Sequence, residues 1–399
     1  MEAPVSRTKL LQEIRKMRFE EAYVGWQEKR LTQEQAAEIL GVTDRSFRRY
    51  VVRYEAEGLE GLIDRRIEVM SARGAPADEV MRLVETYRSR YEGWNVAHFY
   101  GWYRDKHQGA RSYSWVKSGL QKAGVVKRAK GKGRHRKKRE RRPLPGMMLH
   151  QDGSTHEWVA GVSWDLIVTM DDATSEHTSM FFVEEEGTAS SLHGIGQTIA
   201  RKGLFCSFYT DRGSHYFHTP VAGGKVDKSA PTQVGRALAQ LGIEQIAAYS
   251  PQARGRSERA FETHQGRLPK ELALAGITDR AAANRYLEQV YMPRHNVEFA
   301  VAAAGPGTAY VPFIGASLAD ILSEQYERTV MNNNCVTFEN LTLQIPANGE
   351  RHHYVKTCVR VHRYVDGTLA VFHGPRKLAV YDVYGKCAQD YVKEIKQAA

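Results

Sequence analysis

From residue 147 onward, short apolar runs alternate with polar turns, and this pattern constrains the fold more than any other part of the sequence. Three runs, at 147–152, 163–170 and 177–183, follow one another with only short turns between them, which is typical of successive strands. Beyond them we expect a helix at 188–202, a strand at 204–210, a helix at 232–241, a strand at 244–249 and a helix at 258–275. This order predicts an α/β sheet of mixed strand direction.

Two aspartates stand at the ends of predicted strands. Asp152 follows the run Met-Met-Leu-His-Gln, and Asp211 follows Leu-Phe-Cys-Ser-Phe-Tyr-Thr. Gly153 and Gly213, just beyond them, indicate that each strand stops there. A carboxylate at such an edge can face solvent and a metal ion while its strand holds it in place.

A glutamate opens the last helix of this segment. Gly255 lets the chain turn after Tyr-Ser-Pro-Gln-Ala-Arg, and Glu258 begins a helix whose apolar face includes Phe261 and Leu268. We expect this helix to bring Glu258 over the sheet edge. Three hard oxygen ligands that leave room for water and phosphate suit Mg²⁺ or Mn²⁺. Two such ions can activate a nucleophile and stabilise the leaving oxygen of a phosphodiester.

Other carboxylates nearby have simpler explanations. Asp171 and Asp172 lie at a turn between strands, where aspartate is favoured for its bonds to the backbone. Residues 184–186, all glutamate, are expected to be a solvated strand end. Glu262, one helical turn after Glu258, is the serious rival as a metal ligand.

Polar side chains flank the predicted acidic site. His150 and His215 are candidates to contact a substrate phosphate or the attacking water, and packing as ordinary polar residues is the alternative for both. Arg254, Arg256 and Arg259 surround the glutamate and are candidates for phosphate contacts.

Length and composition set the outer limits. A chain of 399 residues exceeds one ordinary core and predicts roughly two to four domains. No window approaches the roughly 18 apolar residues of a membrane span, and the N-terminus has no apolar signal segment. We therefore expect a cytoplasmic protein with no membrane partner. The four cysteines lack C-x-x-C spacing, which favours reduced structural cysteines over a zinc site or disulfides.

Basic residues are concentrated in the front of the chain. Residues 1–150 contain 33 Lys and Arg against 19 Asp and Glu, whereas the remainder contains 24 against 27. This asymmetry predicts a polyanionic partner, and no amphipathic anchor or lipidation motif favours a membrane surface instead. Residues 127–142 hold 11 basic side chains and one acid, Glu140. We expect this run to be a flexible linker that also attaches to phosphates.

Residues 13–66 have the features of a helix-turn-helix domain. Thr32 and Gln35 have the spacing of a capping box, Gly41 supplies the turn, and Thr43 or Asp44 caps a second helix at 45–57. In this motif the second helix enters the major groove of DNA, although a plain helical hairpin with a solvated basic face is the alternative. The candidate DNA-contacting residues of the whole chain are Asp44, Arg45, Ser46, Arg48, Arg49, Arg53, Lys127, Arg128, Lys130, Lys132, Arg134, Arg136, Lys137, Lys138, Arg254 and Arg256.

A second helical domain is predicted at 77–126. Its helices are expected at 78–91, at 95–107 and from Ser112 or Ser114 to Lys122. Its dense aromatic residues favour a small hydrophobic core over stacking on nucleobases. Two tandem helical readers would extend the DNA site beyond one turn of duplex and so raise specificity.

The C-terminal part changes from helix to strand. We expect helices at 280–296 and from Ser317 to about Arg328. Five short strands within 332–381, joined by turns that include Asn-Gly and Asp-Gly, then predict a small β-barrel.

The order of these motifs carries a family resemblance. Asp152, Tyr-Thr-Asp211-Arg-Gly-Ser-His and Ser-Pro-x-x-x-Gly-x-x-Glu258-Arg resemble the DDE transposases of bacterial insertion sequences, whose core is like that of retroviral integrases, and within them the ISNCY-type group. Two features depart from the pattern. The 46 residues between Asp211 and Glu258 exceed the integrase interval, with residues 217–233 as the apparent insertion, and the helix lacks the asparagine that often follows the glutamate.

The resemblance implies a function and a domain plan. It implies a DNA transposase with a ribonuclease-H-like core, in which Asp152, Asp211 and Glu258 bind two Mg²⁺ ions and catalyse strand cleavage and strand transfer. The partners implied are the terminal inverted repeats, target DNA and further copies of the chain in a dimer or larger assembly. The alternative is a DNA-binding transcriptional regulator whose ribonuclease-H-like core has lost catalytic activity. Under either function we expect the protein to associate with the bacterial nucleoid. The predicted domains are 1–70 and 71–126 (helical), 127–146 (linker), 147–310 (core), 311–328 (linker helix), 329–388 (barrel) and 389–399 (tail).

Overall fold

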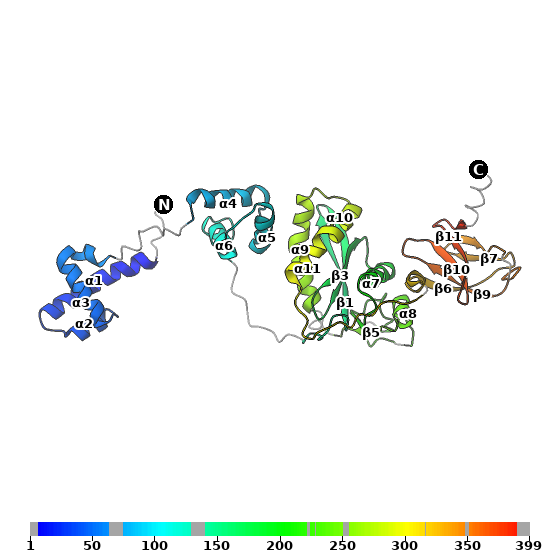
Figure 1. Ribbon diagram of the computed structural model, residues 1–399, viewed down its shortest axis with the longest axis horizontal. Coiled ribbons are helices and arrows are strands. Elements are labelled where there is room, and N and C mark those ends of the chain that lie inside the picture. Colours follow the sequence, from blue (N-terminus) through cyan, green and yellow to red (C-terminus); the bar gives the residue numbers. More distant parts are fainter. Residues whose placement is uncertain are drawn as a thin grey trace. The chain divides into compact units, whose positions relative to one another are not determined.

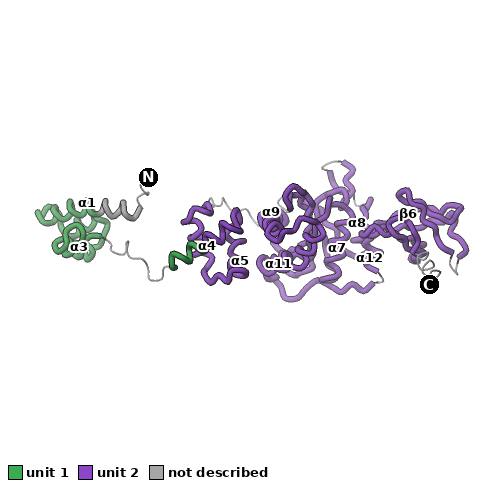
Figure 2. Tube along the Cα trace, turned by 90° about the horizontal axis from the view of Figure 1, so that it is seen from above, with its two compact units in different colours: residues 1–82 green, residues 83–399 purple. Residues whose placement is uncertain are grey.

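The computed structural model describes most of the chain and divides it into two compact units. Unit 1 comprises residues 1–82 and unit 2 residues 83–399 (Figure 2). The described residues are 7–63, 75–128, 140–221, 224–227, 229–249, 255–315, 317–347 and 351–388, with side chains described from residue 16 onward. Among these residues, no helix has the length and apolarity that a bilayer crossing requires.

Unit 1 contains a small bundle of helices whose turns were predicted from local sequence. The Thr32 hydroxyl accepts a hydrogen bond from the Gln35 backbone N–H, and the Gln35 side chain accepts one from Thr32 N–H, so the capping box is confirmed. Thr43, rather than Asp44, caps the next helix, because its hydroxyl accepts from Ser46 N–H. The helices are α1 (Arg7–Gln27), α2 (Gln33–Ile39) and α3 (Asp44–Glu57), followed by a 3-10 turn at Gly58–Leu62.

The predicted helices of residues 77–126 are present. Asn95 caps α5 and Ser112 caps α6, each through a side-chain oxygen that accepts a backbone N–H. The aromatic residues form a buried core, as expected, with Tyr87 and Phe99 packed edge to face at 5.1 Å between ring centroids. The helices are α4 (Ala77–Arg90), α5 (Val96–Lys106) and α6 (Tyr113–Lys122).

The central sheet has five strands in the order β3-β2-β1-β4-β5. β1, β2 and β3 are antiparallel neighbours, whereas β4 pairs with β1 and β5 with β4 in parallel. The mixed α/β sheet predicted from the order of runs is therefore confirmed. The strands are β1 (Leu149–Val159), β2 (Val162–Asp171), β3 (His177–Val183), β4 (Ser207–Thr210) and β5 (Glu244–Ala247).

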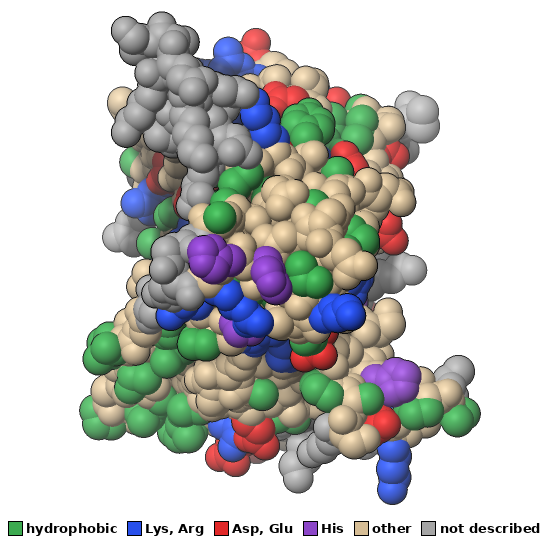
Figure 3. Space-filling model, turned by 90° about the vertical axis from the view of Figure 1, so that its right-hand side faces the viewer, with side chains coloured by type: hydrophobic (Ala, Val, Ile, Leu, Met, Phe, Trp, Pro, Cys, Tyr) green, Lys and Arg blue, Asp and Glu red, His purple; other side chains and the backbone are tan. Residues whose placement is uncertain are grey.

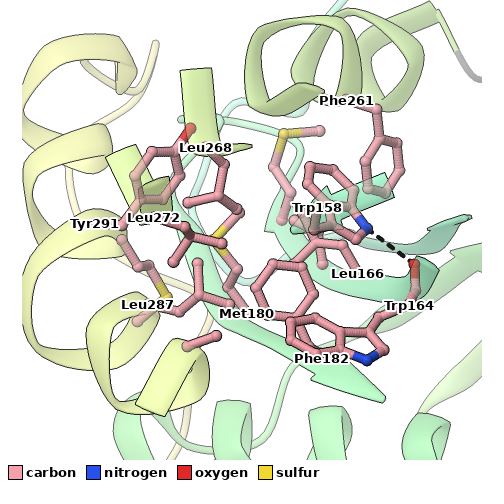
Figure 4. Close-up of a cluster of buried hydrophobic side chains, with 14 residues drawn as sticks. Trp158, Trp164, Leu166, Met180, Phe182, Phe261, Leu268, Leu272, Leu287 and Tyr291 are labelled. Carbon is pink, nitrogen blue, oxygen red and sulfur yellow. Dashed lines mark hydrogen bonds between the residues drawn. The ribbon is translucent and has the colours of Figure 1, made fainter. Parts of the chain in front are cut away.

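Helices cover both faces of this sheet (Figure 1). On one face, Leu149 and Phe208 pack among residues of α7 (Thr188–Lys202) and α8 (Gln233–Gln240). On the other, Trp158, Leu166 and Phe182 meet Leu268 and Leu272, and the Trp158 indole N–H donates to the Trp164 carbonyl at 2.9 Å (Figure 4). This second layer consists of α9 (Gly255–Leu274), α10 (Arg280–Tyr286), a π-helical turn (Leu287–Tyr291) and α11 (Met292–Phe299).

The expectation that the first strand stops at Asp152 was wrong. β1 continues to Val159 and pairs with β2 along this length, with Asp152 opposite Val168 and Gly153 opposite Ile167. The glycine does not end the strand, because the β2 partner supplies the backbone hydrogen bonds on either side of it. Asp152 is thus a mid-strand residue, whereas Asp211 does follow the end of β4 directly.

The C-terminal strands form a four-stranded sheet, β11-β10-β9-β6, and a β7-β8 hairpin. The predicted linker helix was wrong beyond its first turn, because Glu324–Thr329 is strand β6 and pairs along its length with β9. Among the described residues, no strand pairing closes these strands into a barrel. The elements are α12 (Leu318–Ile321), β6 (Glu324–Thr329), β7 (Cys335–Phe338), β8 (Leu341–Gln344), β9 (Cys358–Arg363), β10 (Leu369–His373) and β11 (Arg376–Tyr381).

Candidate active site and DNA-facing surfaces

Parallel pairing of β1 and β4 brings the two predicted aspartates level with each other. Leu149 pairs with Phe208 and His150 with Tyr209, so the same register two residues further places Asp152 opposite Asp211. Neighbouring strands lie about 4.8 Å apart. Asp152 is only 8% exposed, and Asp211 is half-buried, with its Oδ1 accepting a hydrogen bond from Gly213 N–H at 2.9 Å.

Two side-chain contacts hold α9 alongside β1. At its N-terminal end, Arg256 pairs through Nη1 with Oδ1 of Asp172, and the same oxygen lies 2.7 Å from Nε2 of His150 on β1. Further along the helix, Nε2 of Gln265 donates to Oγ of Ser154 at 3.0 Å. The helix is therefore fixed to the strand at two separate points.

The spacing of these two contacts places the predicted glutamate. From Arg256 to Gln265 a helix rises about 13.5 Å, and from His150 to Ser154 a strand extends about 13 Å. The two elements therefore run side by side in the same direction. Glu258 lies just past the first contact and Asp152 midway between the two, so Glu258 comes from the helix that runs beside β1. Among the described residues, the carboxylate oxygens of Asp152, Asp211 and Glu258 do not all lie within 4.8 Å of one another. Glu258 is exposed to solvent.

A buried phenol reports the negative charge of this region. The Tyr216 hydroxyl donates to Oε1 of Gln151 at 2.7 Å. Burial raises the pKa of Tyr216 well above its ordinary value, and the charges of Glu186, Asp152 and Asp211 raise it further. Carboxylates from three separate segments, those of Glu186, Asp152 and Asp211, therefore lie close enough to act on one side chain.

Glu186 is a member of this region that sequence reasoning missed. Its Oε2 occupies the space that a side chain at position 153 would need, because a Cβ built on Gly153 would lie 2.2 Å from it. Its Oε1 lies 3.5 Å from Nε2 of His215, and its backbone N–H donates to Asp165. The available signal was Gly153 itself, since a glycine inside a strand often marks the close approach of another group.

Two of the rival carboxylates, Asp171 and Asp172, have structural roles, as their turn position predicted. Oδ1 of Asp171 accepts from the N–H groups of Ala173 and Thr174, and Oδ2 accepts from Gly146 N–H at 2.7 Å. Asp172, besides binding His150 and Arg256, accepts from Arg142 N–H at 2.8 Å. Glu262 is exposed on α9.

Arg256 differs from the expectation of a phosphate contact. It is committed to Asp172, whose carboxylate is fully buried, so in this structure it anchors the start of α9. Arg254 lies outside the described residues. His150 is likewise buried against Asp172. The side chains of His215 and Asp211 lie near each other, because each has an atom close to a Cβ built on Gly213.

The predicted reading helix presents a basic surface. On α3 the side chains of Arg45, Arg48, Arg49 and Arg53 are exposed, whereas Asp44 and Ser46 are half-buried. The Ser46 hydroxyl lies 3.0 Å from that of Thr43 and belongs to the helix cap.

Basic side chains also lie exposed elsewhere in the chain. Lys127 and Arg128 are exposed at the start of the predicted linker, and its other candidates, Lys130, Lys132, Arg134, Arg136, Lys137 and Lys138, lie outside the described residues. On the face that Figure 3 shows, lysine, arginine and histidine side chains gather in a band across the middle.

Comparisons with known proteins give the chain relatives. A family model described as a winged helix-turn-helix matches residues 23–79. The protein y4bF of Sinorhizobium fredii, provisionally named a transposase, is 29% identical over 355 residues, covering 86% of this chain and 75% of the relative. The transposase for insertion sequence IS1202 of Streptococcus pneumoniae is 27% identical over 261 residues, covering 62% of this chain and 54% of that protein.

Solved structures give only distant likenesses. The HTLV-2 integrase catalytic core domain in complex with magnesium is 16% identical, with a TM-score of 0.28, and the alignment covers 37% of this chain and 89% of that one. The intasome of simian T-cell lymphotropic virus in complex with PP2A regulatory subunit B56 gamma is 13% identical, with a TM-score of 0.33, covering 70% and 92%.

Proposed function

We propose that this chain is a DNA transposase of the DDE type. Its similarity to bacterial transposases confirms the resemblance found in its motifs. The protein binds the terminal inverted repeats of its element, cuts one strand at each end and transfers the exposed 3′-hydroxyl to target DNA. The observation that supports this most is the β1–β4 register, which, extended by two residues, sets Asp152 level with Asp211 just past the end of β4, beside the helix whose first turn contains Glu258.

Divalent metal ions suit this group of carboxylates. Asp152, Asp211 and Glu258 offer hard oxygen ligands of the kind that Mg²⁺ and Mn²⁺ prefer. When bound, two Mg²⁺ ions would supply charge stabilisation and an activated nucleophile for phosphodiester cleavage. The chain's own contribution is to hold the carboxylates on β1, just past the end of β4 and on one anchored helix. These side chains then need little rearrangement when the substrate reacts.

DNA recognition is proposed for the N-terminal helices. The winged helix-turn-helix match covers α2 and α3, and the exposed arginines of α3 suit both base edges and phosphates. The basic run at 127–142 adds contacts that depend on salt but not on sequence. The C-terminal strands, for which a small barrel remains our proposal, are a further surface for DNA or a neighbouring copy. Since two element ends must be joined, we expect a dimer or larger assembly.

The test compares cleavage and binding in single-residue variants of the full chain. A labelled duplex that carries the element's own end is incubated with Mg²⁺ and with wild type, Asp152→Asn, Glu258→Gln or Glu262→Gln. Glu262 is the matched control, because it is an exposed glutamate one turn further along the same helix.

We expect end-specific nicking and strand joining by wild type and Glu262→Gln. Asp152→Asn and Glu258→Gln should lose activity by at least about 10²-fold, as for other groups that act at the reacting centre, while binding persists. Salt-sensitive binding without cleavage by any of the proteins, with Mg²⁺ or Mn²⁺, would instead favour the transcriptional regulator. Equal loss in Glu262→Gln and Glu258→Gln would refute the assignment of Glu258.

A further inference from the structure

Three histidines from three elements converge inside the core. His177 comes from β3, His264 from α9 and His295 from α11, and all are buried, with exposures of 2%, 0% and 7%. One ring nitrogen of each lies within 4.8 Å of the others. Histidine placed this way is the commonest protein ligand of transition metals.

The outer nitrogens of two rings are already held. Nδ1 of His177 lies 3.2 Å from the backbone carbonyl oxygen of Ser175, and Nδ1 of His264 lies 3.0 Å from the Tyr291 hydroxyl. Their Nε2 atoms face each other at 2.9 Å. Metal-binding histidines characteristically use the second ring nitrogen for such an outer hydrogen bond, which fixes the tautomer and aims the lone pair inward.

The third ring adds a nitrogen without a partner. Nδ1 of His295 is buried and makes no hydrogen bond within the described residues. Its ring centroid lies 4.3 Å from that of His177 and 4.7 Å from that of His264. A buried polar atom left unpaired destabilises the folded state, so a bound partner there would stabilise the fold.

We propose that His177, His264 and His295 form a binding site for a transition-metal ion of the Zn²⁺ class, separate from the carboxylate site. Zn–N bonds of about 2.0–2.1 Å in tetrahedral geometry place the nitrogens about 3.3 Å apart. This lies between the 2.9 Å that separates Nε2 of His177 from Nε2 of His264 and the 4.8 Å within which all three ring nitrogens lie. Imidazole nitrogen selects Zn²⁺ or Co²⁺ over Mg²⁺, which prefers oxygen. The site ties β3 and α11 to α9, the helix that carries Glu258.

The surrounding charges are compatible with a cation. The positive charge of Arg267 acts on His264 and His295, and both of its terminal nitrogens bind Glu298 at 2.7 Å, which offsets part of this charge. The fourth coordination position is left to water or another small donor.

The test measures metal binding and does not depend on transposition. Full-length protein is purified without added metal, its zinc content is determined by elemental mass spectrometry, and Co²⁺ is titrated with its visible ligand-field absorption as the signal. The variants are His264→Gln and His295→Gln, and the controls are the exposed surface variant His353→Gln and the carboxylate-site variant Asp152→Asn.

We expect near-stoichiometric binding by wild type and both controls, and at least tenfold weaker Co²⁺ binding by the two core variants. If those variants fail to fold, the zinc X-ray absorption spectrum of wild type counts the imidazole ligands directly. Absence of zinc and cobalt binding in wild type, fewer than three imidazole ligands in that spectrum, or equal binding by His295→Gln, would overturn the proposal. The three histidines would then be a neutral hydrogen-bonded cluster.

Discussion

Nε2 of His98 on α5 lies 2.6 Å from Oε1 of Glu271 on α9, and both side chains are fully buried. Glu271 also accepts a hydrogen bond from the Tyr286 hydroxyl at 2.7 Å and pairs with Arg294 at 3.1 Å. Nearby, Lys270 donates to the backbone carbonyl of Gly93 at 2.9 Å. Helix α5 and the turn before it are thus joined to the same helix whose first turn contains the proposed catalytic glutamate.

Replacing Glu271 should loosen this junction. Glu271→Gln leaves Arg294 without its counter-charge and His98 without a charged acceptor, and breaking a buried pair from one side costs about 3 kcal/mol. Hydrogen exchange of the α5 backbone amides measures this directly and should speed up by about 100-fold. Glu262→Gln, exposed on the same helix, is the control. Unchanged protection of α5 in Glu271→Gln would show that the junction does not depend on this charge.

The same pair predicts how stability depends on pH. Burial lowers the pKa of His98, although Glu271 opposes the shift. For Glu271, burial alone would raise the pKa, but the hydrogen bond from His98 and the charge of Arg294 outweigh it and lower the pKa. Both folded-state pKa values lie below their unfolded values, so both groups make their full contribution to the free energy of unfolding at neutral pH. The contribution of His98 is lost as the pH falls below about 6.5, and that of Glu271 as it falls below about 4.5.

Melting temperatures measured between pH 7 and pH 5 check the sign for His98. Wild type should lose stability across this interval, and His98→Gln should lose less, since its side chain does not titrate. The charged or titratable groups facing His98 are Glu271, Arg294 and Arg267. A steeper pH dependence in His98→Gln than in wild type would contradict the predicted direction.

Local signals predicted the helix ends well because capping is a short-range interaction. Thr32, Thr43, Asn95 and Ser112 each bond a backbone N–H a few residues ahead, which sequence spacing can show. Residues 324–328 were predicted as helix because they favour helix locally, whereas their partners on β9 lie roughly 30 to 39 residues further along the chain. Strand pairing at that separation overrides propensity.

The candidate site shows the same division between local and long-range information. Asp152, Asp211 and Glu258 could be selected from their local motifs. The relative position of these three residues depends on the β1–β4 register and on contacts such as Gln265 with Ser154, which join segments far apart in sequence. Glu186 was missed because its place beneath Gly153 is set by tertiary packing, and an isolated run of three glutamates resembles a solvated turn.

Arg256 distinguishes a positioning role from a phosphate contact. If it anchors α9 through Asp172, Arg256→Gln should lower the cleavage rate but leave the salt dependence of DNA binding unchanged. A phosphate contact would instead lower the slope of log affinity against log salt by about 1. Binding curves at several salt concentrations, run beside cleavage assays, separate the two. Arg285→Gln, exposed on α10 and outside the candidate phosphate contacts, is the matched control.

Glu186 should affect the Mg²⁺ concentration that the proposed catalytic site requires for cleavage. Its charge acts on the same buried phenol as Asp152 and Asp211, so Glu186→Gln removes negative charge that favours a cation there. Groups around a metal site typically change metal affinity or activity by about 10-fold to 100-fold, and we expect the Mg²⁺ concentration for half-maximal cleavage to rise by at least about tenfold. Glu185→Gln, an exposed neighbour, should leave this concentration unchanged. Gly153→Ala, which forces the Glu186 carboxylate to move, should reproduce the effect. A normal Mg²⁺ requirement in both Glu186→Gln and Gly153→Ala would show that Glu186 serves only the packing of the sheet.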